Sequence, residues 1–274
     1  MTQDHRPFKS LEHAGWSEPG VSKTYESYFT SLTSQSTGPL LDAVGAGPGV
    51  RLLEVATGPG HLAFEATKRG ATVVGSDVSP SMVEIARRLY PNVEFRAGDA
   101  EDLPFEDASF DAVVMNYGLL HLSRPELAIQ EAFRVLRAGG RFAFTVWAPP
   151  DRARGFGLIL DAVAAAGNAS VPLPPGPPFF RFADGAESMR VLEATGFTDV
   201  KVIDVPQRWQ LPDANALLEV FEEGTVRTRA LLKGQTPQQI AAIRAAVAQS
   251  AQQFASGDHL DIPMPAVLSS ARKP

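Results

Sequence analysis

Between residues 51 and 147, short apolar runs alternate with segments whose apolar residues recur at helical spacing. The runs are typical of buried strands, and they cover 51–56, 71–76, 93–95, 110–115 and 141–147. The intervening helical segments are 62–69, 79–89 and 125–136. Strands that alternate with helices of this length predict a parallel sheet with helices on both faces.

The pattern is looser on both sides of this region. Residues 1–50 predict short helices, one of which carries Tyr25, Tyr28 and Phe29 as a stripe that faces the core or touches a ligand. After Trp147 we expect a helix over 151–166, a stiff proline-rich connection and a helix over 184–194. A sixth strand over 200–205, two helices over 213–256 and a last strand over 266–271 follow.

Composition excludes several function classes. The 274 residues suffice for one large α/β domain with a modest cap, and 44% of them are hydrophobic, which indicates a globular chain. The net charge is −6 with no basic stripe, which argues against a nucleic-acid partner. The absence of cysteine removes disulfides and thiolate sites and favours a cytoplasmic protein. No apolar run approaches the roughly 20 residues of a membrane span.

A glycine-rich turn over residues 54–60 joins the first predicted strand to a helix, and such a turn lets a ligand approach the backbone. Gly58, Gly60 and Ala63 satisfy the spacing of a dinucleotide fingerprint, but they lie too far past the strand for its tight turn. A turn that starts at Ala56 instead suits a ligand without a pyrophosphate.

Two carboxylates follow the next two strands. Asp77 can accept hydrogen bonds from a ribose diol, and Asp99 can accept one from the adenine amine while the Ala100 N–H donates to a ring nitrogen. Val78 and Met82 can cover the faces of the base. The predicted ligand is adenosine with a short, charged tail that is not a phosphate. Asp77 has a simpler alternative as a helix cap, and Asp99 has one as a turn residue.

Through the glycine-rich turn and the carboxylates that follow it, the sequence resembles the class I S-adenosylmethionine-dependent methyltransferases. The resemblance covers roughly residues 50–148, and it is closest to the small-molecule branch similar to the ubiquinone and menaquinone biosynthesis enzymes. Five motifs in order carry it: 54–60, 75–79, 98–105, 110–114 and 136–140.

The resemblance implies a role for each motif residue. Glu54 and the backbone at Ala56, Gly58 and Gly60 hold the methionine end of the cofactor, and the Asn116 backbone carbonyl accepts from its ammonium. It likewise implies that Asp77 binds the ribose and that Asp99 and Ala100 bind the adenine. Ala56 stands where the family usually has its first glycine.

The catalytic candidates follow the fourth strand. His121 is a candidate general base for an acceptor hydroxyl, or alternatively a packed residue that shapes its loop. Tyr117 is a candidate for the wall of the substrate pocket. No histidines and carboxylates have metal-ligand spacing, so we predict no metal.

We therefore expect a Rossmann-like, doubly wound, seven-stranded sheet, mostly parallel, with an added helical cap. By resemblance, the last strand runs antiparallel beside the sixth. The expected division is an N-terminal helical cap over 1–37 and a methyltransferase domain over 38–274, with cap insertions at about 151–182 and 207–258.

The predicted function is S-adenosylmethionine-dependent SN2 methyl transfer to an O, N or C nucleophile of a small molecule. Aromatic residues in the cap favour an apolar or aromatic acceptor. One alternative is an NAD-dependent oxidoreductase, which the glycine spacing disfavours. The other is a catalytically inactive S-adenosylmethionine-binding regulator. The sequence carries no signal for the oligomeric state.

Overall fold

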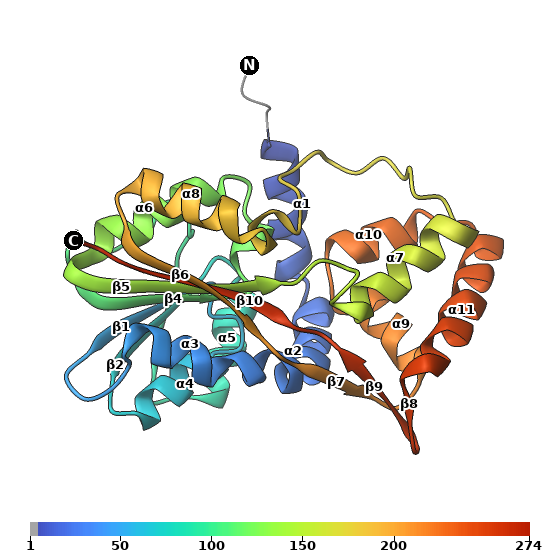
Figure 1. Cartoon of the computed structure of the whole chain (residues 1–274), viewed down its shortest axis with the longest axis horizontal. Coiled ribbons are helices and arrows are strands. Elements are labelled where there is room, and N and C mark those ends of the chain that lie inside the picture. Colours follow the sequence, from blue (N-terminus) through green and yellow to red (C-terminus); the bar gives the residue numbers. More distant parts are fainter. Residues whose placement is uncertain (1–4) are drawn as a thin grey trace.

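A seven-stranded sheet forms the centre of the computed structural model, which describes residues 5–274 (Figure 1). The strand order is β3-β2-β1-β4-β5-β10-β6, and only β10 runs antiparallel to its neighbours. The strands are β1 (Arg51–Val55), β2 (Thr72–Asp77), β3 (Glu94–Ala97), β4 (Phe110–Asn116), β5 (Leu136–Trp147), β6 (Thr198–Val205) and β10 (Ala266–Arg272). The predicted mostly parallel sheet is confirmed, including the antiparallel last strand beside the sixth.

Helices cover both faces of this sheet. α6 (Pro125–Val135) and α8 (Gly185–Thr195) lie on one face, and α3 (Thr37–Val44), α4 (His61–Lys68) and α5 (Pro80–Leu89) lie on the other (Figure 1). The middle of β4 is therefore fully buried at Ala112, Val113 and Val114. This double cover explains why the central strands are apolar runs rather than alternating patterns.

Local signals in the sequence fix several helix ends. The Ser79 and Asp184 side chains accept hydrogen bonds from the first turns of α5 and α8. Gly196 ends α8 with a φ of 104°, and Thr236 forms a capping box at the start of α11 (Pro237–Ala251). Within residues 5–274, no helix is both long enough and apolar enough to cross a membrane.

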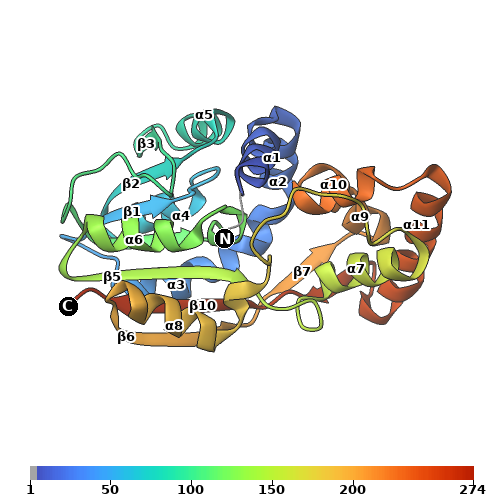
Figure 2. The same cartoon turned by 90° about the horizontal axis from the view of Figure 1, so that it is seen from above.

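A cap lies beside the sheet (Figures 1 and 2). Besides α11, it contains α7 (Arg154–Ala166), α9 (Ala214–Glu223) and α10 (Arg227–Lys233). It also has a small antiparallel sheet in the order β7-β9-β8, formed by β7 (Arg208–Leu211), β9 (His259–Pro263) and β8 (Ala255–Ser256).

The sequence pattern missed this small sheet, and it predicted two helices over 213–256, where the structure has three: α9, α10 and α11. Its strands have two to five residues, which is too short for alternation to stand out. Pairing of Trp209 with Ile262 also joins residues far apart in the chain, so no local signal marks it. The helix break at Gly224 divides what reads as one amphipathic stretch.

Two N-terminal helices, α1 (Arg6–Ser17) and α2 (Pro19–Thr33), lie between the sheet and the cap (Figure 2). α1 fits closely against the cap and the proline-rich linker. A Cβ atom on Gly15 would lie 2.6 Å from Val226, and one on Gly176 would lie 2.4 Å from Phe8. Glycine at these two positions therefore allows α1 to be held on two sides.

Candidate functional site

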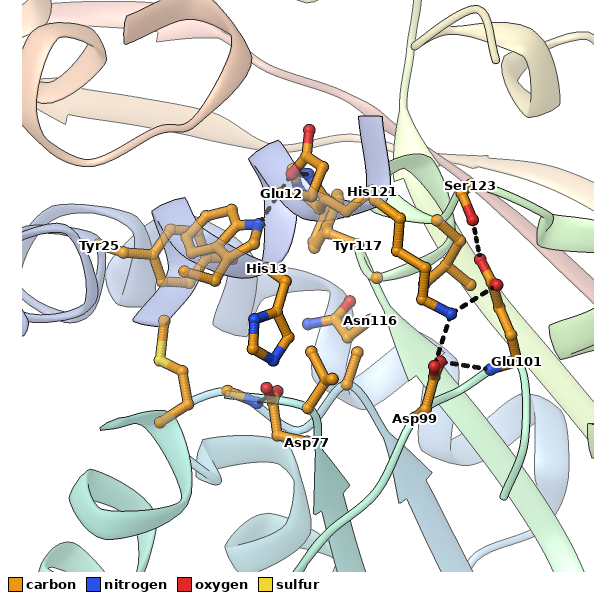
Figure 3. Close-up of a pocket in the computed structure, with 18 residues that line it drawn as sticks. Glu12, His13, Tyr25, Asp77, Asp99, Glu101, Asn116, Tyr117, His121 and Ser123 are labelled. Carbon is orange, nitrogen blue, oxygen red and sulfur yellow. Dashed lines mark hydrogen bonds and ion pairs between the residues drawn. The ribbon is translucent and has the colours of Figure 1, made fainter. Parts of the chain in front are cut away.

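A pocket opens at the carboxyl ends of β1, β2 and β4, below α1 (Figure 3). Nine of the predicted site residues line it: Ala56, Gly58, Asp77, Val78, Met82, Asp99, Asn116, Tyr117 and His121. We call it the main pocket, and its other lining residues are Lys9, Glu12, His13, Trp16, Tyr25, Glu101, Gly118, Leu122 and Ser123. Carboxyl ends of parallel strands are where open α/β sheets bind ligands.

The glycine-rich turn forms one wall through unusual backbone angles. Ala56, Gly58 and Gly60 have φ values of 54°, 52° and 82°, in the left-handed region that disfavours side chains. Gly60 does not line the main pocket, and a Cβ there would lie 2.6 Å from the Phe95 ring. Ala56 keeps its methyl group at some cost, because L-residues are strained in this region.

Asp77 links the turn to the next helix. Its Oδ2 accepts a hydrogen bond from the Gly58 N–H at 2.8 Å, and its Oδ1 accepts one from the Ser79 N–H at 2.8 Å. Burial raises the pKa of this carboxyl above its usual range. Asp77 therefore lines the main pocket as expected, whereas the cap of α5 is Ser79 rather than Asp77. Each carboxylate oxygen retains further acceptor capacity toward the pocket.

Glu54 lies behind the turn, in an adjoining cavity shared with Tyr25, Asn116 and the turn itself. It is 2% exposed, and its Oε2 accepts hydrogen bonds from Thr57 Oγ1 at 2.6 Å and the Ala63 N–H at 2.8 Å. Burial raises its pKa to about 8. Oε1 makes no hydrogen bond with any residue of the described chain, so it can accept from a cationic ligand.

A basic residue from α1 reaches Asp99 on the opposite side of the main pocket (Figure 3). Lys9 Nζ donates to Asp99 Oδ2 at 2.6 Å and to Glu101 Oε2 at 2.8 Å. Glu101 is buried and also accepts from the Ser123 hydroxyl at 2.7 Å. Although burial acts in the opposite direction, these hydrogen bonds lower the pKa of Glu101 to about 2. Asp99 Oδ1 also accepts from the Glu101 N–H, as a turn residue would.

Asn116 and Ala100 are placed differently from one another. The Asn116 side chain lines the main pocket, and its Oδ1 accepts from the hydroxyls of Ser36 at 2.9 Å and Thr145 at 2.5 Å. These bonds fix the residue at the end of β4. Ala100 is buried in the turn after Asp99 and does not line the main pocket.

Tyr117 forms the back wall of the main pocket. Its φ is 56°, and the centre of its ring lies 3.9 Å from that of the Trp147 ring, on which it stacks. Its hydroxyl donates a hydrogen bond to Gln207 Oε1 at 2.6 Å. Burial raises the pKa of this phenol far above neutral. The phenol therefore stays protonated at neutral pH and provides a rigid wall rather than a base.

His121 is held by a buried carboxylate from α1. Its Nδ1 lies 3.0 Å from Glu12 Oε2, which also accepts from Trp16 Nε1 at 3.0 Å. The Glu12 side chain is 5% exposed. A carboxylate at Nδ1 favours the tautomer with its proton there, which leaves Nε2 as a hydrogen-bond acceptor.

The sequence reasoning missed every pocket residue on α1: Lys9, Glu12, His13 and Trp16. One signal was present for Glu12. Phe8, Glu12 and Gly15 form the buried stripe of the helix at i, i+4 and i+7, and a carboxylate in such a stripe is costly without a partner.

A second cavity lies beyond His121 and Tyr117, and we call it the aromatic chamber. It shares Trp16, Tyr25, Tyr117 and His121 with the main pocket. Its other lining residues are Phe29, Trp147, Phe156, Phe179, Thr225, Val226, Arg227 and Thr228. The walls come from α1, α2, the loop after β4, β5, α7, the proline-rich linker and the start of α10.

Comparison with known proteins agrees with this geometry. Residues 53–144 match a family model described as a methyltransferase domain. A demethylmenaquinone methyltransferase of Beutenbergia cavernae is 42% identical over 123 residues, which cover 43% of this chain and 51% of the relative. The chain spans about half the length of the curated relatives it matches.

Solved structures show the same fold over nearly the whole chain. The [4+2]-cyclase SpnF is 21% identical and has a TM-score of 0.58, with 96% of this chain and 97% of SpnF covered. A phosphoethanolamine N-methyltransferase of Haemonchus contortus, solved with S-adenosyl-L-methionine, is 17% identical with a TM-score of 0.59. That match covers 97% of this chain and 60% of the relative. The resemblance to the methyltransferases is thus confirmed over residues 53–144 by the family match, and the solved structures show that the fold is shared.

Proposed function

We propose that this chain, whose residues 53–144 match a methyltransferase domain, transfers the methyl group of S-adenosylmethionine to a small acceptor molecule. The acceptor is apolar or aromatic and reacts through an O, N or C nucleophile. One observation carries the proposal. The ends of β1, β2 and β4 and the loop after β3 bring Gly58, Asp77, Asn116 and Asp99 into one pocket, at the positions that the motifs require.

The charge of this region suits a cationic cofactor. Glu54, Asp77 and Asp99 are acidic, whereas S-adenosylmethionine carries a sulfonium and an ammonium. Asp77 would accept from the ribose hydroxyls, and Glu54 Oε1 and the Asn116 carbonyl would accept from the ammonium. Val78 and Met82 would cover the adenine, and Asp99 would accept from its amine. Lys9 must release Asp99 Oδ2 for that last contact.

When bound, the cofactor would supply an electrophilic methyl group: an electron pair of the acceptor would form the new bond to carbon, and the electron pair of the broken C–S bond would stay on sulfur. The protein's main task is then alignment, which alone can supply roughly 7–11 kcal/mol of barrier reduction. The rigid Tyr117 wall and the covering helix α1 exclude water from the junction of the two cavities.

His121 is the proposed general base for an acceptor that carries a proton. Its Nε2 receives this proton, and the Glu12 carboxylate stabilises the imidazolium that forms. The aromatic chamber lies next to His121 and receives the acceptor. Its ring faces favour a flat, apolar molecule.

We also propose a cytoplasmic location and a small-molecule partner rather than a nucleic acid. The chain has no cysteine, and its net charge of −6 leaves no basic stripe for phosphates.

Calorimetric titration with S-adenosylhomocysteine, with NAD in parallel, tests the cofactor. We expect micromolar binding of the former and none of the latter. Binding of NAD alone would favour an oxidoreductase. Protein with bound S-adenosylmethionine is then screened against small aromatic acceptors, with S-adenosylhomocysteine release as the readout. Tight cofactor binding without turnover on any acceptor would favour a regulator without catalysis.

A further inference from the structure

Arg227, at the start of α10, lines the aromatic chamber. Its guanidinium lies 4.9 Å from the centre of the Phe8 ring and 5.6 Å from that of Phe179. Its Nη1 donates a hydrogen bond to the Pro177 carbonyl at 3.2 Å, the one hydrogen bond of this side chain to the described part of the protein. Within residues 5–274, no carboxylate oxygen lies within ion-pair distance of it.

Other half-buried arginines of this protein are paired. Arg229, two residues further on, lies 2.6 Å from Glu18. Arg181 lies 2.6 Å from both Glu126 and Glu187. Arg227 is therefore the exception among these three, and it is the one that faces a cavity.

The guanidinium has unused bonding capacity in a poorly hydrated place. It carries five N–H donors and cannot lose its proton in a protein. One donor bonds Pro177, and ring faces surround the group. Burial lowers the pKa of Arg227, and Glu12 acts on it only from a distance while its own Oε2 is bonded to His121 and Trp16. An anion in the chamber would offset this desolvation cost.

The position of Arg227 relative to His121 limits the size of such an anion. Both groups contact the same ring, since the His121 ring lies 5.8 Å and the guanidinium 5.6 Å from the centre of Phe179. A flat molecule that lies along Phe179 can therefore reach both groups. The hydroxyl-bearing Thr225 and Thr228, next to Arg227 in the chain, also line the chamber.

We infer that the acceptor is a small aromatic carboxylate, whose carboxylate binds Arg227 while its nucleophile faces His121. The inference rests on the proposed methyl transfer and adds a charge requirement to it. Arg227 is a specificity-determining residue in this scheme and takes no part in bond making. The anion also complements the cationic cofactor next to it, which favours binding of the two together.

Binding of simple probes to protein saturated with S-adenosylhomocysteine tests this inference. The probes are benzoate with benzamide, and 2-naphthoate with 2-naphthamide, followed by ligand-observed NMR and calorimetry. Within a pair, the two probes share their ring and differ in charge. We expect at least one carboxylate to bind ten or more times more tightly than its amide.

Arg227→Gln and Arg227→Lys are compared with Lys233→Gln, which removes an exposed positive charge from the same helix. We expect Arg227→Gln to abolish the preference for the carboxylate, Arg227→Lys to retain part of it, and Lys233→Gln to leave it intact. The inference is overturned if no probe binds, if the amides bind as well as the carboxylates, or if the preference survives in Arg227→Gln.

Two further measurements distinguish failure of this inference from failure of the proposed function and from a purely structural role of Arg227. S-adenosylhomocysteine affinity should be the same in all three variants, because Arg227 does not line the main pocket. If the parent protein does not bind S-adenosylhomocysteine, the proposed function itself fails. If Arg227→Gln lowers the melting temperature by several degrees and the parent shows no charge preference, Arg227 serves only to fasten the linker to α10.

Discussion

The main pocket and the aromatic chamber share a wall at Tyr117 and His121, yet they are built in different ways. The floor of the main pocket consists of turns that directly follow neighbouring parallel strands, and hydrogen bonds hold it, such as that from the Gly58 N–H to the Asp77 carboxylate. The chamber is assembled from seven separate segments, and ring packing holds it, such as Phe156 against Phe179, whose ring centres lie 5.4 Å apart.

This difference separates two kinds of dependence. A change in the floor should act on cofactor affinity, since the sheet fixes those groups whatever the cap does. A change in the chamber should act on acceptor affinity or turnover and leave the cofactor in place. The following substitutions test whether cofactor binding in the main pocket is independent of acceptor binding in the aromatic chamber.

His121→Ala should have the largest effect. Loss of a general base lowers kcat by about 100- to 10,000-fold. Affinity for S-adenosylhomocysteine should stay within about twofold of the parent, because the resemblance assigns His121 no cofactor contact. Steady-state kinetics with an acceptor whose nucleophile carries a proton, together with calorimetry, measure both quantities.

Glu12→Gln is the companion variant. It keeps the size of the side chain but replaces the carboxylate that bonds His121 Nδ1 with a neutral amide. It should lower kcat less than His121→Ala does. A parallel loss of cofactor affinity in either variant would mean that the two halves are not separable.

Asp77→Ala should instead weaken cofactor binding. Loss of hydrogen bonds to a carboxylate weakens S-adenosylhomocysteine binding by about 1–3 kcal/mol, or roughly five- to 150-fold in Kd. Titration calorimetry measures it, and a thermal melt verifies folding, because Asp77 also bonds Gly58 and Ser79. Glu84→Ala, at an exposed position of α5, is the control. Parent-like affinity in Asp77→Ala would exclude Asp77 from the site.

Glu54 should make cofactor binding release a proton. Its folded pKa of about 8 means that the free protein is largely protonated there at pH 7. An ammonium group at Oε1 favours the carboxylate, so binding at pH 7 should release about one proton and binding at pH 9 almost none. Calorimetry in two buffers of different ionisation enthalpy measures the release, and Glu54→Gln should abolish it.

The raised pKa of Glu54 also predicts the direction in which the stability of the folded protein changes with pH. Folding binds a proton at Glu54 between its unfolded pKa and about 8, so this contribution is complete at acid pH and is lost as pH rises through 8. Glu54→Gln should therefore flatten the fall in melting temperature between pH 6 and pH 9. An unchanged slope would show that Glu54 is already charged in the folded protein.

Ala56→Gly should have the smallest effect. It removes the strain of a φ of 54° at the cost of a more flexible unfolded chain, for a net gain in stability of about 0.5–1 kcal/mol. Cofactor affinity should change by less than about threefold, since the cofactor uses the backbone here. Ala108→Gly, with a φ of 50° in an exposed turn, should give a similar gain and leave affinity unchanged. Chemical denaturation measures both.

The contrast between the main pocket and the aromatic chamber also explains which site residues could be predicted from the sequence. Strand ends and the residues after them are local features, so Asp77 and Asp99 could be placed together from the alternation of strands and helices. Glycine spacing identified the turn, although it did not show that Gly60 packs against Phe95 rather than facing the ligand. Ala100 is likewise buried away from the main pocket.

The chamber depends on contacts between distant segments. Phe156 and Phe179 could be seen as cap aromatics, but nothing local shows that they meet Trp16 or Tyr117 around one space. The same holds for Glu12, which is 109 residues from His121 in the chain. Such pairs require the complete tertiary arrangement, and a single sequence carries no record of it.

The position of α1 has a consequence for the time course of the reaction. This one helix supplies Lys9, Glu12 and Trp16 to the roof of the main pocket, and Lys9 bridges to Asp99 and Glu101 across it. We expect release of the spent cofactor to need that bridge to open, because the cofactor lies beneath α1. The dependence of turnover on solvent viscosity measures how far this motion, rather than the chemical step, sets the steady-state rate.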